Sequence, residues 1–157
     1  MGVQDVSLQI HRHQMMTSDD YAATSWPESG TKRYPREVLS IPQHLASVAH
    51  QMEQLLNLKE NWNSYGAHRI SRDSVASAMY VLTAYNTGIP VPDVFPTAKG
   101  GVKLEWGDDS ESVELEFQPE GAIAILIDES GEMRESVVRD LNDPAVFDAL
   151  NWAEKLS

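Results

Sequence analysis

From residue 42 onward the apolar positions recur first every three or four residues and later every second residue. The first period predicts a helix over about 42–58, with Ser40 as its cap and Pro42 in its first turn. Its apolar stripe consists of Leu45, Val48, Met52, Leu55 and Leu56. One apolar stripe of this kind is typical of a helix that packs on a core.

A second helical stripe follows Ser71, which is suited to the N-cap position. Asp73 lies in the first turn of this helix, where the positive end of the helix dipole favours a carboxylate. The stripe consists of Val75, Ala78, Met79, Leu82 and Tyr85. Gly88 suits the position after the helix, and Pro90 prevents continuation. The two stripes, joined by a short loop, predict a helical hairpin.

From about residue 101 the apolar positions recur every second residue. The segments "GVKLEW" and "SVELEFQ" alternate apolar and polar residues, and "GDDSE" between them is typical of a hairpin turn. The next segment, "AIAILID", is apolar on both faces and indicates a more covered strand. After another turn, "MRESVVR" is suited to an edge strand. These segments predict an antiparallel meander of three to four strands.

Two further segments complete the domain. "GIPVPDVFPT" has three prolines within seven residues, which favours an extended crossing over the surface. "DPAVFDALNWAEKLS" predicts a C-terminal helix with Asp143 as cap and Pro144 as its first residue. The order predicts an α+β fold over residues 39–157: a helical hairpin, the meander and a C-terminal helix, with helices covering one face of the sheet.

Residues 1–38 differ from the rest and are interpreted as an N-terminal arm. "VSLQIHRH" alternates and permits one strand, while the following polar stretch with Pro27, Gly30 and Pro35 indicates a loop or a mobile segment. A tail that orders on a partner is the alternative. His11 and His13 would share one side of such a strand, but two histidines do not make a metal site.

Composition narrows the class of protein. The chain has 157 residues, of which 41% are hydrophobic, so it can form a core. It contains no run of about 20 apolar residues that would span a membrane and no apolar signal-peptide segment, and we expect a cytoplasmic protein without membrane contact. The absence of cysteine excludes disulfides, thiolate zinc sites and thiol nucleophiles.

The net charge of −12 is distributed unevenly along the chain. Residues 1–99 carry nine acids and eight bases, whereas residues 100–157 carry fifteen acids and four bases. Such a field repels nucleic-acid phosphates and attracts basic protein surfaces. We therefore expect a protein partner with a basic surface and no direct binding of nucleic acid. Solubility alone is the alternative explanation of the charge.

Acidic side chains on the predicted hairpin are the candidate contacts for that partner. Glu105, Glu114 and Glu116 share the outward face of the two strands. The predicted partner-binding residues are Glu105, Trp106, Asp108, Asp109, Glu114 and Glu116. Paired carboxylates could serve acid–base catalysis only if burial raised one pKa, and the alternation places these acids toward solvent.

The connection "KENWNSYGAHRIS", residues 59–71, is dense in aromatic and polar residues. Asn61 and Asn63 suit turns, and Gly66 permits a positive φ. Trp62 and Tyr65 are expected to pack under the helix pair. The loop is thereby interpreted as structural, and only the two residues after Ala67 remain without a structural task.

Those two residues, His68 and Arg69, leave an enzymatic alternative open. A hydrolase or metal-dependent enzyme would use His68 with an acid such as Glu105 or Asp128. The chain has no nucleophile elbow, zinc-binding HExxH motif, phosphate-binding loop or dinucleotide fingerprint to supply the other roles. We therefore expect no catalytic residue, no metal and no cofactor.

The middle of the chain follows the pattern W-[DN]-x-[YF]-G-A-x-x-I-S, a helix, P-x-x-x-P-T-x-x-G-G-V-x-L-E-W and a short acidic strand. The matching positions are Trp62, Asn63, Tyr65, Gly66, Ala67, Ile70, Ser71, Pro92, Pro96, Thr97, Gly100, Gly101, Val102, Leu104, Glu105 and Trp106. Over about residues 55–121 the chain resembles a widespread group of small uncharacterised bacterial and phage proteins. Asn63 stands where Asp is commoner, which weakens a catalytic-carboxylate role there. The resemblance implies a compact domain from mobile or accessory gene settings, and favours antitoxin, immunity or anti-defence roles.

These observations favour a non-enzymatic acidic protein-binding module, such as an inhibitor, an antitoxin or an anti-CRISPR-like or anti-restriction-like protein. A structural subunit or adaptor of a larger nucleoprotein assembly, held through the N-terminal arm, is the alternative. The enzyme based on His68 is the second alternative.

Overall fold

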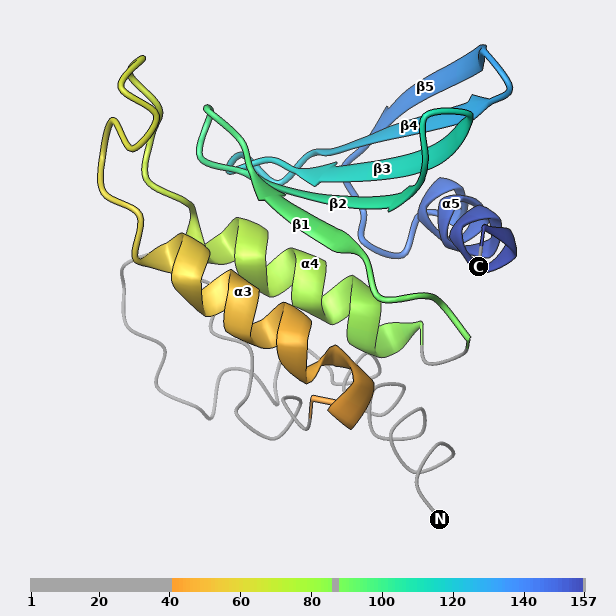
Figure 1. Ribbon diagram of the computed structural model, residues 1–157, viewed down its shortest axis with the longest axis horizontal. Helices are drawn as coiled ribbons and strands as arrows, with labels where there is room; N and C mark the ends of the chain where they lie inside the picture. The colour runs from red at the N-terminus through yellow and green to blue at the C-terminus, as the bar shows by residue number, and fades with distance from the viewer. Residues whose placement is uncertain (1–40, 86–87, 157) are drawn as a thin grey trace, which may run out of the picture. The chain divides into compact units, whose positions relative to one another are not determined.

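Three α-helices cover one face of a five-stranded antiparallel sheet within the part of the chain that the structure describes (Figure 1). This computed structural model describes residues 41–85 and 88–156, which belong to one compact unit, Ile41–Ser157. The strands follow one another in the order β1-β2-β3-β4-β5, a simple meander. The predicted arm at 1–38 and the Ser40 cap lie outside the described residues.

The second and third helices begin where the sequence places their caps. α4 (Arg72–Ala84) is capped by Ser71, whose Oγ accepts a hydrogen bond from the Ser74 amide at 3.3 Å. α5 (Pro144–Lys155) is capped by Asp143, whose Oδ1 accepts from the Ala145 amide at 2.9 Å. Both side chains satisfy amides that the first turn of a helix leaves unpaired.

The first helix is shorter than the predicted span of 42–58. It opens as the 3₁₀ turn η2 (Gln43–Leu45) and continues as α3 (Ala46–Leu56). Pro42 has extended backbone angles, φ −54° and ψ 141°, so it precedes the helical turn. Tight 3₁₀ turns are frequent at helix starts.

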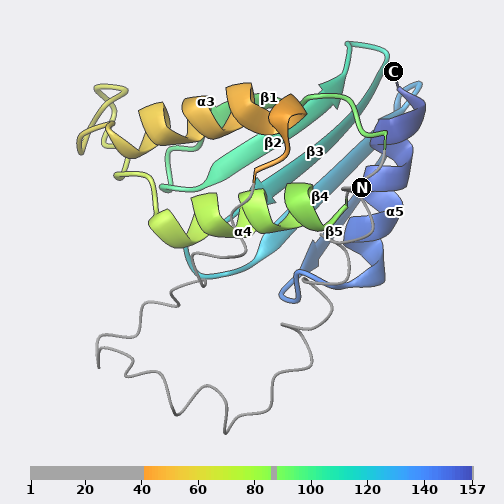
Figure 2. The ribbon, with the colours of Figure 1, turned by 90° about the horizontal axis from the view of Figure 1, so that it is seen from below.

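The four longer strands are β2 (Val102–Gly107), β3 (Glu111–Phe117), β4 (Ile123–Glu129) and β5 (Glu132–Val138). β2 and β3 follow the predicted alternation, β4 alternates between buried and half-buried residues over most of its length, and β5 is exposed at all but its last residue. The residues that face the helices are buried: Val102, Leu104, Trp106, Val113, Leu115, Phe117, Ile123, Ile125 and Ile127. α3 packs beside β1, α4 against β2 and β3, and α5 against β3 and β4. Figure 2 shows the three helices on this side of the sheet. The α+β prediction, with an antiparallel sheet and a C-terminal helix, is confirmed.

The predicted count of three to four strands is wrong. The extra strand is β1 (Asp93–Pro96), which lies inside the proline-rich segment and pairs antiparallel with β2, with Val94 opposite Leu104. A proline in a strand is tolerated at a sheet edge, because its missing N–H need not serve a neighbour. The prolines favour an extended backbone, and part of this extended segment, Asp93–Pro96, forms a short edge strand.

None of the helices among residues 41–85 and 88–156 has the length and apolar character needed to cross a membrane.

Candidate functional site

The face of the sheet opposite the helices carries the predicted acidic row. The antiparallel register places Asp93, Glu105, Glu114, Leu126 and Glu135 in one line across all five strands. We call the side of the sheet opposite the three described helices the outer face. Glu116 lies on the same face in the neighbouring line, directly opposite Lys103. The structure thus brings Glu105, Glu114 and Glu116 together as predicted from the alternation.

Glu105 and Glu114 face each other directly, and Lys103 joins them. The Lys103 Nζ lies 2.8 Å from Glu105 Oε2 and 3.2 Å from Glu114 Oε2, and 5.2 Å from the centre of the Phe95 ring. Burial opposes the charge on this half-buried ammonium, but its hydrogen bonds to Glu105 and Glu114 outweigh that effect and raise the pKa of Lys103. Part of the acidic row is therefore neutralised within the chain.

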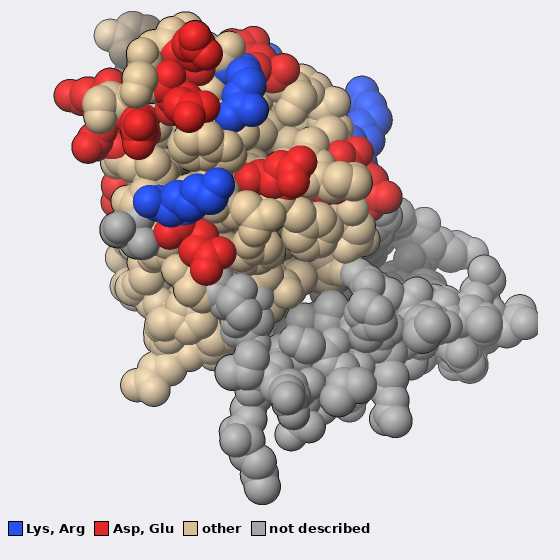
Figure 3. Space-filling model, turned by 90° about the vertical axis from the view of Figure 1, so that its right-hand side faces the viewer, with Lys and Arg blue, Asp and Glu red and all other residues tan. Residues whose placement is uncertain are grey.

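A second concentration of acids lies where the β2–β3 and β4–β5 turns meet. The Ser130 amide donates to the Ser110 carbonyl at 3.0 Å, which holds the two turns side by side. This acidic end consists of Asp108, Asp109, Glu111, Asp128, Glu129 and Glu132. Figure 3 views the molecule from this side and shows Asp and Glu side chains gathered over its upper part, with a few Lys and Arg side chains between them.

Asp108 organises the first of these turns. Its Oδ1 accepts hydrogen bonds from the Ser110 hydroxyl at 2.6 Å, the Ser110 amide at 2.8 Å and the Glu111 amide at 3.3 Å. These bonds favour the ionised carboxylate and lower the pKa of Asp108, the Ser110 hydroxyl contributing most. Asp108 is therefore first a structural residue of the turn, and its charge is fixed in place at the acidic end.

One predicted contact residue does not lie on this surface. The Trp106 side chain is only 4% exposed and belongs to the core, and its Nε1 donates to the Pro90 carbonyl at 2.7 Å. The alternation that directs Glu105 outward directs Trp106 inward, so its inclusion among the partner contacts is corrected. Conversely, sequence reasoning missed four residues of the acidic end: Glu111, Asp128, Glu129 and Glu132. The available signal was that alternate turns of a meander lie at the same end of a sheet.

The loop at residues 59–71 is held by its two asparagines, as predicted. Asn63 Oδ1 accepts from the amides of Tyr65 at 2.9 Å and Ala67 at 3.1 Å, and Asn61 Oδ1 accepts from the Gly66 amide at 2.6 Å. The backbone takes positive φ at Asn61 (61°), Ser64 (65°) and Gly66 (84°). Side-chain bonds of this kind replace regular secondary structure and give the loop a defined shape.

Tyr65 does not pack under the helices as expected. Its side chain is 92% exposed at the tip of the loop, since the left-handed residues on either side direct it outward. Trp62 is half-buried, and its Nε1 donates to the His68 carbonyl at 3.2 Å. A large aromatic side chain held in solvent on a loop of defined shape is suited to contact with another molecule.

The base of the same loop is fastened to the β1–β2 turn. The His68 amide donates to the Ala98 carbonyl at 2.9 Å, and the Ser71 amide donates to the Gly100 carbonyl at 2.8 Å. Gly100 has φ +88°, and a Cβ at this position would lie 2.6 Å from the Arg69 carbonyl oxygen. Only glycine allows this approach without strain. The contact joins two parts of the sequence pattern described above, the loop that ends at Ser71 and the segment that contains Gly100.

His68 pairs with Glu60 rather than with the acids of the enzymatic alternative. The His68 Nδ1 lies 3.0 Å from Glu60 Oε1, and both side chains are more than half exposed. The Arg69 amide donates to Glu60 Oε2 at 2.9 Å, and this bond, followed by the one from His68, lowers the pKa of Glu60. The pair closes the loop, which gives His68 and the Arg69 backbone a structural role.

The acids proposed as partners of His68 are engaged elsewhere. Glu105 binds Lys103, and Asp128 Oδ1 accepts from the Gly131 amide at 2.9 Å in the β4–β5 turn. Within the described part of the chain, no group of three or more His, Asp or Glu side chains could hold a metal ion.

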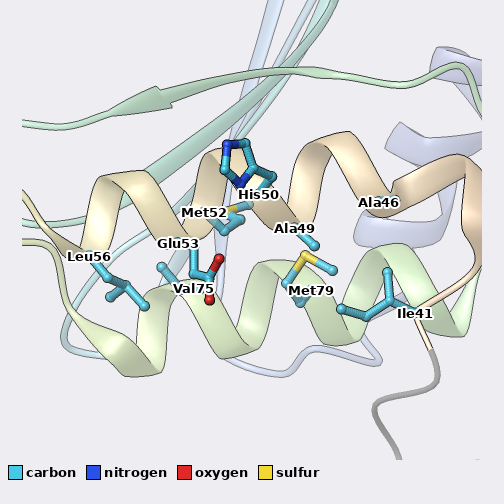
Figure 4. A pocket seen from close by; sticks show the side chains of 9 residues that line it. All are labelled: Ile41, Ala46, Ala49, His50, Met52, Glu53, Leu56, Val75 and Met79. Atoms are coloured by element: carbon cyan, nitrogen blue, oxygen red, sulfur yellow. The ribbon is translucent and has the colours of Figure 1, made fainter.

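An apolar groove of about 450 Å³ lies between α3 and α4. Its walls are Ile41, Ala46, Ala49, Met52, Leu56, Val75 and Met79, with His50 and Glu53 as the polar lining residues. Figure 4 shows Met79 pointing toward α3, while the His50 ring points away from α4. This lining offers apolar contact rather than acid–base chemistry.

No family model matches the chain, and no curated protein or solved structure matches it. The resemblance to the group of small bacterial and phage proteins thus stays a prediction.

Proposed function

We propose that this chain is a non-enzymatic, acidic protein-binding module that engages a basic surface on a partner protein. The observation that supports the proposal most is the meeting of the two acidic turns through the Ser130–Ser110 hydrogen bond. It places six carboxylates at one end of the sheet, and the outer face continues the negative charge through Glu114 and Glu116. The basic side chains on the five described strands are Lys103 and Arg134, each already paired with acids of the chain.

Such a surface would act chiefly on the encounter between the two proteins. Complementary charge raises the association rate and rejects like-charged partners, while exposed aromatic groups supply more of the affinity. Where the basic surface of the partner normally holds DNA or RNA, the bound module would compete with the nucleic acid. The module would then be an inhibitor, an antitoxin or an anti-defence protein.

The structure suggests which acids to reverse in a test. Reversing Glu105 or Glu114 would also break the Lys103 ion pairs and reversing Asp108 would disturb its turn, so these three are left in place. The test variant is Asp109→Lys, Glu116→Lys and Glu132→Lys in the full chain. The matched control is Glu53→Lys, Glu120→Lys and Asp148→Lys, three exposed acids on α3, a turn and α5. Both variants change the net charge by the same amount.

Each chain is used as bait in nuclease-treated lysate of the source cells, and the retained proteins are quantified by mass spectrometry at low and moderate salt. We expect a basic protein that the wild type and the control retain, and that the test variant retains about tenfold less at low salt. The proposal is wrong if both variants retain the same proteins equally. It is also wrong if the wild type retains proteins only from a parallel lysate that has not been treated with nuclease.

A further inference from the structure

β5 is an edge strand of the sheet, and its residues are more exposed than those of the other strands. It pairs with β4 over all seven residues, Glu132–Val138, and no other described strand lies beside it. All of its residues except Val138 are exposed. The opposite edge, β1, is only four residues long and ends in Pro96. A long edge strand without proline offers unpaired backbone groups to a further strand.

Charged side chains on an edge often prevent such pairing, but Arg134 is drawn back onto its own molecule. Its guanidinium lies 3.7 Å from Glu129 Oε2 and over the Trp152 ring of α5, 5.8 Å from the ring centre. Arg134 therefore faces the helix side of the sheet and leaves the backbone edge accessible. On the outer face the strand presents Met133, Glu135 and Val137, of which Met133 is 68% and Val137 is 66% exposed.

The sequence of β5 is complementary to itself in one antiparallel register. In a continuous sheet, residues opposite each other must lie on the same face, so outer residues pair with outer residues. With Glu135 at the two-fold axis, Met133 of one copy lies opposite Val137 of the other, and the same contact occurs twice. We propose that the chain forms a homodimer in which two β5 strands pair antiparallel about Glu135 and join two sheets into one.

The same register places the two Glu135 carboxylates opposite each other. Like charges at directly opposed positions weaken strand pairing by about 0.2–1 kcal/mol, which corresponds to a factor of about 1.4 to 5 in the dissociation constant. Two Met133–Val137 contacts and the backbone hydrogen bonds oppose this repulsion. The resulting dimer is reversible, and removal of the Glu135 charge tightens it.

The register can be tested by charge pairing across the strands, with sedimentation velocity of the full chain over a range of concentrations. Met133→Lys alone and Val137→Glu alone each replace an apolar contact, and we expect each to weaken the dimer about tenfold or more. The double variant Met133→Lys with Val137→Glu places Lys opposite Glu twice in the proposed register. We expect it to recover dimerisation relative to either single variant. Both substitutions lie at exposed positions, and circular dichroism of the three variants verifies that the fold is retained.

Glu135→Gln provides a second, independent measurement. We expect it to tighten the dimer up to about fivefold, whereas Glu116→Gln, on the same face but two strands away, leaves the dissociation constant unchanged. A chain that stays monomeric at all concentrations, including the Glu135→Gln variant, overturns the proposal. A dimer that does not respond to these substitutions uses another surface and overturns it equally.

Discussion

At the scale of single residues, Gly100 joins the two most distinctive parts of the chain. It combines a left-handed φ of +88° with a close approach to the Arg69 carbonyl. Gly100→Ala imposes both backbone strain and a steric clash, and we expect it to lower the free energy of unfolding by about 2–4 kcal/mol. Urea denaturation followed by tryptophan fluorescence measures the change.

Gly121→Ala is the matched control for that substitution. Gly121 has nearly the same φ, +86°, but a Cβ there would meet no atom within 4 Å. It should cost about 1 kcal/mol, from backbone strain alone. Equal losses in the two variants would show that the approach of the loop to the β1–β2 turn does not stabilise the fold.

Residue roles that depend on local hydrogen bonding could be predicted from the sequence. The direction in which a side chain of the 59–71 loop points could not. Asn61, Asn63 and Ser71 act as the sequence indicated, because an asparagine or serine side chain bonds to nearby backbone wherever the turn forms. The outward position of Tyr65 follows from three left-handed residues of the loop, Asn61, Ser64 and Gly66. Two of these, Asn61 and Ser64, are not glycine, so composition did not reveal the path of the loop.

At the scale of elements, hydrophobic periodicity predicted both long helices, the four longer strands and the terminal helix. It did not predict β1, because four residues with a proline carry too little alternation to distinguish a strand from an extended crossing. Only the register with β2 makes this segment a strand, and pairing with a distant segment is not encoded in a local pattern.

The Lys103 bridge stabilises the β2–β3 pair. Lys103→Met keeps much of the aliphatic stem but leaves Glu105 and Glu114 facing each other without a counter-charge. We expect a loss of about 1 kcal/mol in the free energy of unfolding at low salt and neutral pH. The loss is measured by urea denaturation and should diminish at high salt.

A second substitution separates repulsion from lost packing. Adding Glu114→Gln to Lys103→Met removes one of the two facing charges, and most of the lost stability should return. Recovery would not occur if Lys103 acts mainly through its contact with the Phe95 ring.

At the scale of the whole molecule, the sequence indicated the sign and the region of the charge but not its grouping. Glu105, Glu114 and Glu116 could be placed together because strand alternation is local. The acidic end required knowledge that the β2–β3 and β4–β5 turns touch, which depends on the matched lengths of β3 and β4. Trp106 was predicted as a contact, but the alternation of β2 directs it into the core, where it is only 4% exposed.

The hydrogen bonds of Asp108 make the stability of the protein depend on pH. A carboxyl whose folded pKa is lowered stabilises fully above its unfolded pKa of 3.8 and loses this effect as the pH falls through the folded value.

Asp108→Asn should therefore destabilise the protein at pH 7, and its difference from the wild type should shrink as the pH falls below about 3.8. Asp109→Asn removes the same charge from the same turn but leaves the three hydrogen bonds of Asp108 in place, so it should stabilise slightly at pH 7. Urea denaturation of the three proteins from pH 7 to pH 3, at low salt, measures both trends. If Asp108→Asn stabilises as much as Asp109→Asn, the acidic end is held by the strands alone, and its charges are free to be rearranged without loss of the turn.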